Sequence, residues 1–158
     1  YATPETLGID RMVLAAGATL MYPNQNRLII DAGTCITYDF VNAENQYLGG
    51  AISPGIKIRY KSLNNYTSKL PLLTLSEDFE IIGNSTKSAI HSGVINGVIF
   101  EIEGFISQYS LKNQDLTIIL TGGDAEFLAK RLKSTIFANS NFLLESLNLL
   151  SLYTQKND

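Results

Sequence analysis

The segment RLIIDAGTCITYDFV (residues 27–41) predicts two strands joined by a tight turn, and this hairpin determines the class of fold. Residues 27–31 form a short apolar run, as in a buried strand, and residues 35–41 alternate between apolar and polar side chains. Gly33-Thr34 supplies the turn between them. Residues 46–52 predict a third strand, so three strands linked by hairpins begin the sheet.

The rest of the chain alternates between helices and strands. Helices are expected at residues 10–21, 56–64 and 84–107, with a loop over residues 66–80. Beyond them the pattern predicts a strand at residues 116–120, a helix at 124–132, a strand at 142–144, a helix at 147–153 and a polar tail at 155–158. Hairpin strands followed by αβ units predict an α/β fold, with a mixed sheet and helices on both faces.

The composition is that of an ordered domain. Only 17% of the residues are charged and 45% are hydrophobic, whereas a typical globular domain has about 25% charged residues. The 12 Lys and Arg residues against 15 Asp and Glu give a net charge of -3, which argues against nucleic acid as a partner. No uncharged apolar run reaches the roughly 18 residues of a membrane span, and a single cysteine excludes an internal disulfide.

The sharpest motif is Asp31-Ala32-Gly33-Thr34, which directly follows a predicted strand. Gly33 allows the backbone to approach a nucleotide phosphate, and the Thr34 hydroxyl can donate a hydrogen bond to it. Asp31 is an anion and does not bind phosphate directly, so its natural role is to hold a cation or the water around one. The alternative is a plain hairpin turn with an exposed acid.

A second glycine motif, Gly122-Gly123, joins a predicted strand to a predicted helix. Such a turn places a ligand against the free amides of a helix N-terminus, at the carboxyl end of a strand. The alternative is a tight turn in which Asp124 caps the helix.

Two polar segments precede predicted helices. In Gly8-Ile9-Asp10-Arg11, Asp10 is a candidate general base for a substrate hydroxyl, and the alternative is an ion pair at the helix start. Residues 83–86 carry hydroxyl groups that either bind a polar substrate or cap the long helix.

The glycine-rich residues 49–55 form a further motif. They either wrap a small ligand or form ordinary turns.

Two reactive residue types are expected to be structural. His91 is the only histidine and lies in an apolar stretch of the long helix. Cys35 follows Thr34 on a strand, where a small buried hydrophobe is expected and not an activated nucleophile.

The order and spacing of these motifs resemble the type III pantothenate kinases, from residue 1 to about residue 153. The motifs are Tyr1-x-Thr-Pro-x-Thr-Leu-Gly8-Ile-Asp10-Arg11, Asp31-Ala-Gly33-Thr34, Gly49-Gly50-Ala-Ile-Ser-Pro54-Gly55, Thr67-x-x-Leu70-Pro71, Gly83-Asn-Ser-Thr86 and Thr121-Gly122-Gly123.

This resemblance implies the actin-like and sugar-kinase-like (ASKHA) fold, which is built from two RNase H-like domains. It implies ATP-dependent phosphorylation of the 4′-hydroxyl of pantothenate, the first step of coenzyme A biosynthesis. The cofactors would be ATP, Mg²⁺ and a monovalent cation, either K⁺ or NH₄⁺. The enzyme would be a cytoplasmic homodimer that pairs through the helix at residues 84–107, where Gly93 and Gly97 allow close packing.

The resemblance also implies a role for each motif residue. Asp10 would be the general base, and Asp31 would bind the monovalent cation. Pantothenate would contact Tyr1, Gly8, Ile9, Asp10, Arg11 and Thr86, with Thr86 coming from the same or the other subunit. ATP would lie against Gly33, Thr34, Gly122 and Gly123.

One departure from the family pattern affects the domain organisation. Family members begin with a domain that carries an Asp-x-Gly-Asn-Thr phosphate loop, and this sequence has none. We therefore expect residues 1–26 to join a missing N-terminal domain to a C-terminal RNase H-like domain at residues 27–158, and we expect little kinase activity from the chain alone. The alternatives are another small-molecule kinase of the same fold and a regulatory accessory factor without enzymatic activity.

Overall fold

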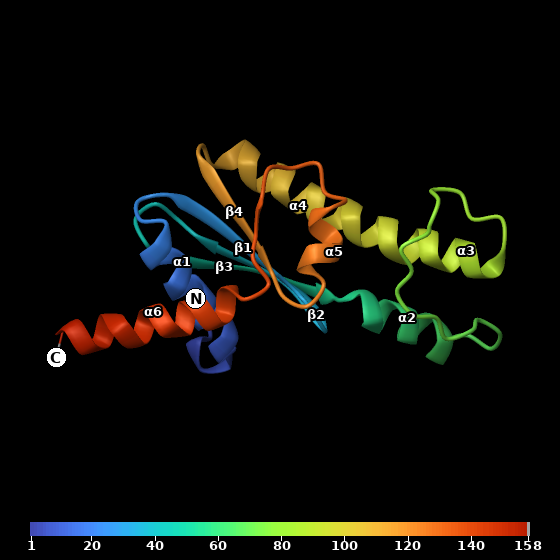
Figure 1. Ribbon diagram of the computed structural model, residues 1–158, viewed down its shortest axis with the longest axis horizontal. Coiled ribbons are helices and arrows are strands. Elements are labelled where there is room, and N and C mark those ends of the chain that lie inside the picture. The colour runs from blue at the N-terminus through green and yellow to red at the C-terminus, as the bar shows by residue number, and fades with distance from the viewer. Residues whose placement is uncertain (158) are drawn as a thin grey trace.

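The computed structural model describes residues 1–157 and contains a five-stranded mixed sheet in the order β3-β2-β1-β4-β5 (Figure 1). The strands are β1 (Asn26–Ala32), β2 (Cys35–Val41), β3 (Tyr47–Pro54), β4 (Leu116–Thr121) and β5 (Phe137–Ala138). β1, β2 and β3 are antiparallel neighbours, while β4 is parallel to β1 and β5 is parallel to β4. This order and these directions confirm the predicted α/β class and match an RNase H-like sheet.

Helices cover both faces of the sheet, as predicted. Helices α1 and α6 lie together on one side of the sheet in Figure 1, and α4 and α5 lie on the other. The helical elements are η1 (Pro4–Thr6), α1 (Ile9–Met21), α2 (Ile56–Asn65), α3 (Thr86–His91), η2 (Ser92–Asn96), α4 (Gly97–Lys112), α5 (Ala125–Ala129) and α6 (Phe142–Asn157).

The middle of strand β1, residues 28–30, is an uninterrupted apolar run, and both of its faces are buried. Leu28 and Ile30 point into the larger core, under α4 and α5, whereas Ile29 points into the smaller core beneath α1 and α6. A strand covered on both sides needs apolar residues at successive positions. The run at residues 28–30 therefore places β1 at the centre of the sheet.

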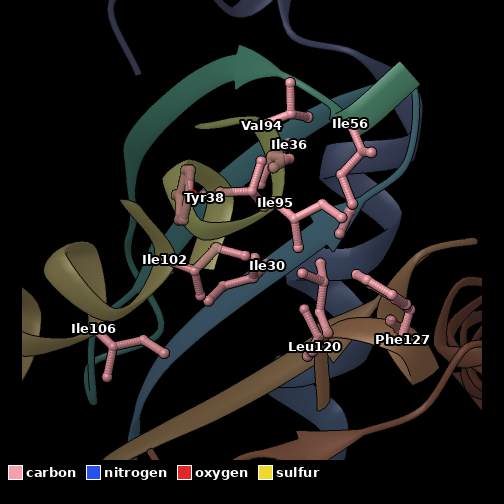
Figure 2. Close-up of a cluster of buried hydrophobic side chains, with 14 of the residues drawn as sticks. Ile30, Ile36, Tyr38, Ile56, Val94, Ile95, Ile102, Ile106, Leu120 and Phe127 are labelled. Carbon is pink, nitrogen blue, oxygen red and sulfur yellow. The ribbon is translucent and has the colours of Figure 1, made fainter. Parts of the chain in front are cut away.

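The larger core joins the sheet to the long helix. Figure 2 shows Ile30 and Tyr38 of the sheet beside Ile95 and Ile102 of the helix, and all four are almost fully buried. The Tyr38 ring also stacks on Phe105 with 4.1 Å between ring centroids. Burial of each large apolar side chain contributes about 1.5–3 kcal/mol, so this contact fixes the helix on the sheet.

The helix predicted at residues 84–107 runs from Thr86 to Lys112, through α3, the π-helical turn η2 and α4. By length and composition alone it could cross a membrane. One side of it, however, is buried in the larger core through Val98, Ile102 and Ile106. A partly buried apolar face of this kind is typical of a core helix in a globular domain.

The prediction for the C-terminal part was partly wrong. Residues 142–144 begin helix α6 and are not a strand, and the edge strand β5 lies earlier. The Asn139 side chain accepts a hydrogen bond from the Asn141 backbone N–H at 3.0 Å, which turns the chain just before the helix. Phe142 is then buried against α1. Helix α6 continues to Asn157, so the predicted polar tail is helical up to that residue, and Asp158 lies outside the described residues.

Candidate functional site

The two glycine motifs meet at the carboxyl ends of β1 and β4. Asp31 of β1 pairs in register with Thr121 of β4, and Gly122 follows directly. Gly122 has a φ of 93°, and a Cβ atom there would collide with Asp31 Oδ1 and with the Ala32 carbonyl oxygen. Only glycine fits this position without strain, so the loops predicted to bind nucleotide lie against each other.

The first loop also touches the N-terminus of α2. The Gly55 backbone N–H donates a hydrogen bond to the Thr34 carbonyl oxygen at 3.0 Å. In contrast to these packed positions, no described atom lies within 4 Å of a Cβ built on Gly33 or on Gly123. The two glycines therefore leave open space beside backbone amides, as a phosphate-binding site requires.

Asp31 lies half-buried between these loops. No donor within residues 1–157 forms a hydrogen bond with its carboxylate, and no ion pair neutralises it. Burial raises the pKa of Asp31, and the negative charges of Asp10 and Asp39 raise it further. A carboxylate in these surroundings gains from a bound cation.

The residues around Asp31 offer oxygen ligands to a cation. In the described part of the chain, no three His, Cys, Asp or Glu side chains come together as a metal site. The Ala32 carbonyl oxygen, like Asp31 Oδ1, lies close to Gly122. One carboxylate beside backbone carbonyl groups supplies the oxygen ligands that hard cations prefer.

Asp10 lies in the first turn of α1, and its charge reaches Asp31. The Asp10 side chain is exposed, and its Oδ1 accepts a hydrogen bond from the Arg11 backbone N–H at 2.9 Å. The charge of the candidate base therefore acts on the candidate cation ligand. The alternative of an Asp10–Arg11 ion pair is wrong, because the Arg11 guanidinium turns away to another carboxylate.

That carboxylate belongs to Asp39 on β2, which the sequence analysis missed. Asp39 is fully buried, and its Oδ1 accepts hydrogen bonds from Arg11 Nε at 2.8 Å and from the Tyr47 hydroxyl at 2.6 Å. Burial alone would lower the pKa of Arg11, but the hydrogen bond and the charge of Asp39 outweigh it, and the pKa is raised. An acid in the middle of a strand with buried neighbours was the signal available, because such a charge needs a partner.

Tyr1 joins this group from the N-terminus. Its ring centroid lies 5.6 Å from that of Tyr47, and its ring would be in van der Waals contact with a Cβ atom built on Gly49. Ile9 keeps 75% of its surface exposed beside Asp10. Tyr1, Gly8, Ile9, Asp10 and Arg11, predicted to bind substrate, therefore gather around the start of α1.

Thr86 does not join them within one chain. It is the first residue of α3, which lies at the opposite end of the molecule from α1 in Figure 1. The preceding Ser85 caps the helix by accepting a hydrogen bond from the Ser88 N–H at 3.2 Å. Thr86 itself is exposed at the rim of a cavity of about 450 Å³ that Leu63 and Leu70 also line. The capping alternative therefore accounts for Ser85, and Thr86 stays free to contact a ligand.

A second polar cluster, also missed, links the loop at Gly55 to the long helix. Glu101 accepts hydrogen bonds from Tyr38, Ser53 and Arg59 at 2.9, 2.5 and 2.5 Å. Burial alone would raise the pKa of Glu101, but these three hydrogen bonds lower it. Arg59 also donates to the Pro54 carbonyl oxygen at 2.8 Å. The cluster holds the start of α2 in place, and with it the Gly33-Thr34 turn.

The outcomes for the remaining predicted residues are mixed. His91 is structural as expected, because its Nδ1 is 2.8 Å from the Tyr60 hydroxyl. Cys35 is exposed and not buried, since it is the first residue of β2 at the open end of the sheet. Asp124 makes no side-chain cap in the described structure, and its backbone N–H instead donates to the Ala32 carbonyl oxygen at 2.9 Å.

Paired glycine loops at the carboxyl ends of neighbouring parallel strands, on an RNase H-like sheet, are the arrangement expected of a phosphate site. Comparison with known proteins specifies it further. The family model described as type III pantothenate kinase matches residues 1–108. The chain is a member of the type III pantothenate kinase family.

Curated relatives named type III pantothenate kinase agree with this assignment. The protein from Flavobacterium johnsoniae is 66% identical over the whole chain, and that from Flavobacterium psychrophilum is 67% identical over 97% of it. The Cytophaga hutchinsonii protein is 44% identical over 97% of the chain. This chain spans 65% of the length of the Flavobacterium johnsoniae protein and 64% of that of the Flavobacterium psychrophilum protein.

A solved structure supports the fold. A Campylobacter jejuni protein, described as a conserved Baf family transcriptional activator, aligns with a TM-score of 0.68 and 23% identity. The alignment covers 97% of this chain and 67% of that protein. At this identity the likeness concerns the fold alone.

Proposed function

We propose that this chain supplies the acceptor base and part of the nucleotide site of an enzyme that phosphorylates the 4′-hydroxyl of pantothenate with ATP. That reaction is the first step of coenzyme A biosynthesis. One observation carries the proposal. The negative charge of Asp10 acts on Asp31, and Asp31 packs against Gly122, which supports a site shared by the candidate base and both glycine loops.

Asp10 would accept the proton of the pantothenate hydroxyl. Its carboxylate is exposed and makes no ion pair with Arg11, so an oxygen remains free to face a substrate. General base catalysis needs such an acceptor within hydrogen-bond reach of the hydroxyl. Tyr1, Gly8, Ile9 and Arg11 would form the surrounding pantothenate site.

The ATP phosphates would lie over Gly33, Thr34, Gly122 and Gly123. The open space beside Gly33 and Gly123 suits an approaching phosphate, and the Thr34 hydroxyl is exposed and has no protein partner within residues 1–157. Positioning and charge stabilisation account for most of the catalysis of phosphoryl transfer. Pre-formed loops of this kind are therefore consistent with a kinase.

Asp31 would hold the monovalent cation, K⁺ or NH₄⁺, and Mg²⁺ would bind mainly through the ATP phosphates. When bound, these cations supply positive charge against the phosphates. The absence of a three-ligand acidic cluster among the described residues supports this division of roles.

Two further parts of the proposal concern assembly. The separation of Thr86 from Asp10 is consistent with a homodimer that brings Thr86 of one subunit to the site of the other, through residues 84–107. Phe100 on that helix is 61% exposed, no described atom lies within 4 Å of a Cβ built on Gly93, and the Arg59 side chain lies 3.9 Å from one built on Gly97. Residues 1–26 would join residues 27–158 to an N-terminal domain, and the enzyme would act in the cytoplasm.

A coupled assay for ADP release tests the proposed activity. The complete polypeptide that carries these residues would be compared with the 158-residue chain, with Mg²⁺ and with or without K⁺. We expect pantothenate-dependent turnover from the complete polypeptide, stimulation by K⁺, and little turnover from the shorter chain. ADP release that does not depend on pantothenate would instead indicate another acceptor, and no turnover would indicate a non-enzymatic role.

A further inference from the structure

We infer that Asp39 is a positioning residue for substrate recognition, which holds Arg11 so that one guanidinium nitrogen faces an anionic group of the substrate. The inference rests on the proposed pantothenate kinase activity. It adds a buried residue that does not itself contact substrate, and it assigns Arg11 the recognition of a carboxylate.

The geometry of the pair fixes two of the three guanidinium nitrogens. Arg11 Nε and Nη2 both lie close to Asp39 Oδ1, at 2.8 and 2.6 Å. The Arg11 side chain is 8% exposed and that of Asp39 is fully buried. A side chain held by two contacts to one buried oxygen has little freedom to rotate.

The third nitrogen is available to a ligand. Arg11 Nη1 forms no hydrogen bond or ion pair with any described residue. Nη1 is also not a fully buried atom without a hydrogen-bond partner, as Arg27 Nε is. Nη1 is therefore accessible to solvent and can donate a hydrogen bond to a carboxylate.

Asp39 is itself held in place from two sides. The Tyr47 hydroxyl donates to Oδ1 at 2.6 Å, and the Thr37 hydroxyl donates to Oδ2 at 3.2 Å. Tyr47 in turn contacts the Tyr1 ring. A chain of contacts thus connects the interior of β2 with Arg11 and Tyr1, both of which are placed in the pantothenate site.

The burial of the Arg11–Asp39 ion pair supports a role in substrate recognition over a purely structural role. A buried ion pair adds little net stability compared with an apolar pair of similar size. A role in holding Arg11 for substrate explains why a charged pair occupies this position.

The test is Asp39→Asn in the complete polypeptide, assayed with two acceptors. Pantothenate carries the carboxylate, and panthenol replaces it with a hydroxymethyl group while keeping the reacting hydroxyl. We expect the variant to raise KM for pantothenate about tenfold, the effect of one lost charge-assisted hydrogen bond. KM for panthenol and KM for ATP should change by less than about twofold.

Two further variants keep the result interpretable. Tyr47→Phe removes only the hydroxyl that holds Asp39, and should raise KM for pantothenate selectively by about threefold even if Asp39→Asn does not fold. Glu103→Gln is the control for general destabilisation, because Glu103 binds Lys133 and Ser134 away from the site. It should lower stability without changing either acceptor's KM.

The outcomes separate the two proposals. If the unmodified enzyme phosphorylates neither acceptor, the proposed function fails. If it is active but Asp39→Asn and Tyr47→Phe raise KM equally for pantothenate and panthenol, or leave both unchanged, the role assigned to Asp39 is wrong.

Discussion

Gly122 packs so closely against Asp31 that a side chain at position 122 would overlap the Asp31 carboxylate. The two residues belong to loops that are far apart in sequence but follow adjacent parallel strands, with Asp31 opposite Thr121. The contact brings the candidate cation ligand and the second phosphate loop into one site.

Gly122→Ala should disrupt this contact. The residue has a φ of 93° and no room for a Cβ atom, so we expect a loss of about 1–3 kcal/mol in the free energy of unfolding and a higher KM for ATP. Urea denaturation and initial-rate kinetics measure the two effects. Gly123→Ala is the matched control for stability, because space beside Gly123 is open. Equal stability losses in both variants would contradict the packing argument.

Asp31→Asn should increase stability at neutral pH when K⁺ is absent. Folding raises the pKa of Asp31 above its ordinary value of 3.8, so the carboxylate begins to disfavour the folded state above about pH 3.8 and does so fully once the pH exceeds the folded pKa. The advantage of the variant should disappear below about pH 3.8, where the carboxyl group is protonated in both states. Thermal unfolding across this pH range measures it.

Adding K⁺ tests whether Asp31 holds the cation. Binding to the folded state should raise the melting temperature of the unmodified protein but not that of Asp31→Asn. Equal stabilisation of both proteins by K⁺, compared with Na⁺ at the same ionic strength, would place the cation elsewhere.

Glu101→Gln should be destabilising, and the effect should depend on pH. Hydrogen bonds from Ser53, Arg59 and Tyr38 lower the pKa of Glu101 below 4.5 despite its burial. The carboxylate therefore stabilises the fold above about pH 4.5, and this stabilisation is lost as the pH falls through the lower folded pKa. At pH 7 we expect a loss of about 1–3 kcal/mol. A difference between the two proteins that stays constant from pH 7 to pH 3 would show that the charge of Glu101 is not involved.

Gly17→Val should weaken the site from a distance. A Cβ atom on Gly17 would collide with Ser146 of α6, so α1 must move away from α6 and carry Asp10 and Arg11 with it. We expect a loss of about 1–3 kcal/mol from overpacking together with a lower kcat. Gly104→Ala, on an open helix surface, is the comparison for the stability measurement alone. Unchanged stability and kcat in Gly17→Val would contradict the close α1–α6 contact.

The sequence predicted the centre of the fold better than its edge. Strand β2 has the predicted bounds, and the apolar run at residues 28–30 correctly placed β1 in the middle of the sheet. The failure came at residues 142–144, because three apolar residues in a row fit a strand and a helix equally well. Only the tertiary contact of Phe142 with α1 determines that they are helical.

The candidate site was likewise predicted only in part. Motifs formed by neighbouring residues, such as Asp31 to Thr34, were visible in the sequence, and the carboxyl ends of parallel strands are a general place for ligands. Asp39 and Glu101 were missed because their partners are 28 and 42 residues away, in Arg11 and Arg59. Such pairings depend on strand register and helix packing, which a single sequence does not reveal.

The most direct test of the central claim is the pantothenate-dependent turnover of Asp10→Asn in the complete polypeptide. If Asp10 is the base that accepts the hydroxyl proton, kcat should fall by about 10²–10⁴-fold, while KM for ATP and the free energy of unfolding stay close to those of the unmodified enzyme. Turnover within a fewfold of the unmodified enzyme would show that Asp10 is not the base, and would contradict the assignment of the active site to the start of α1.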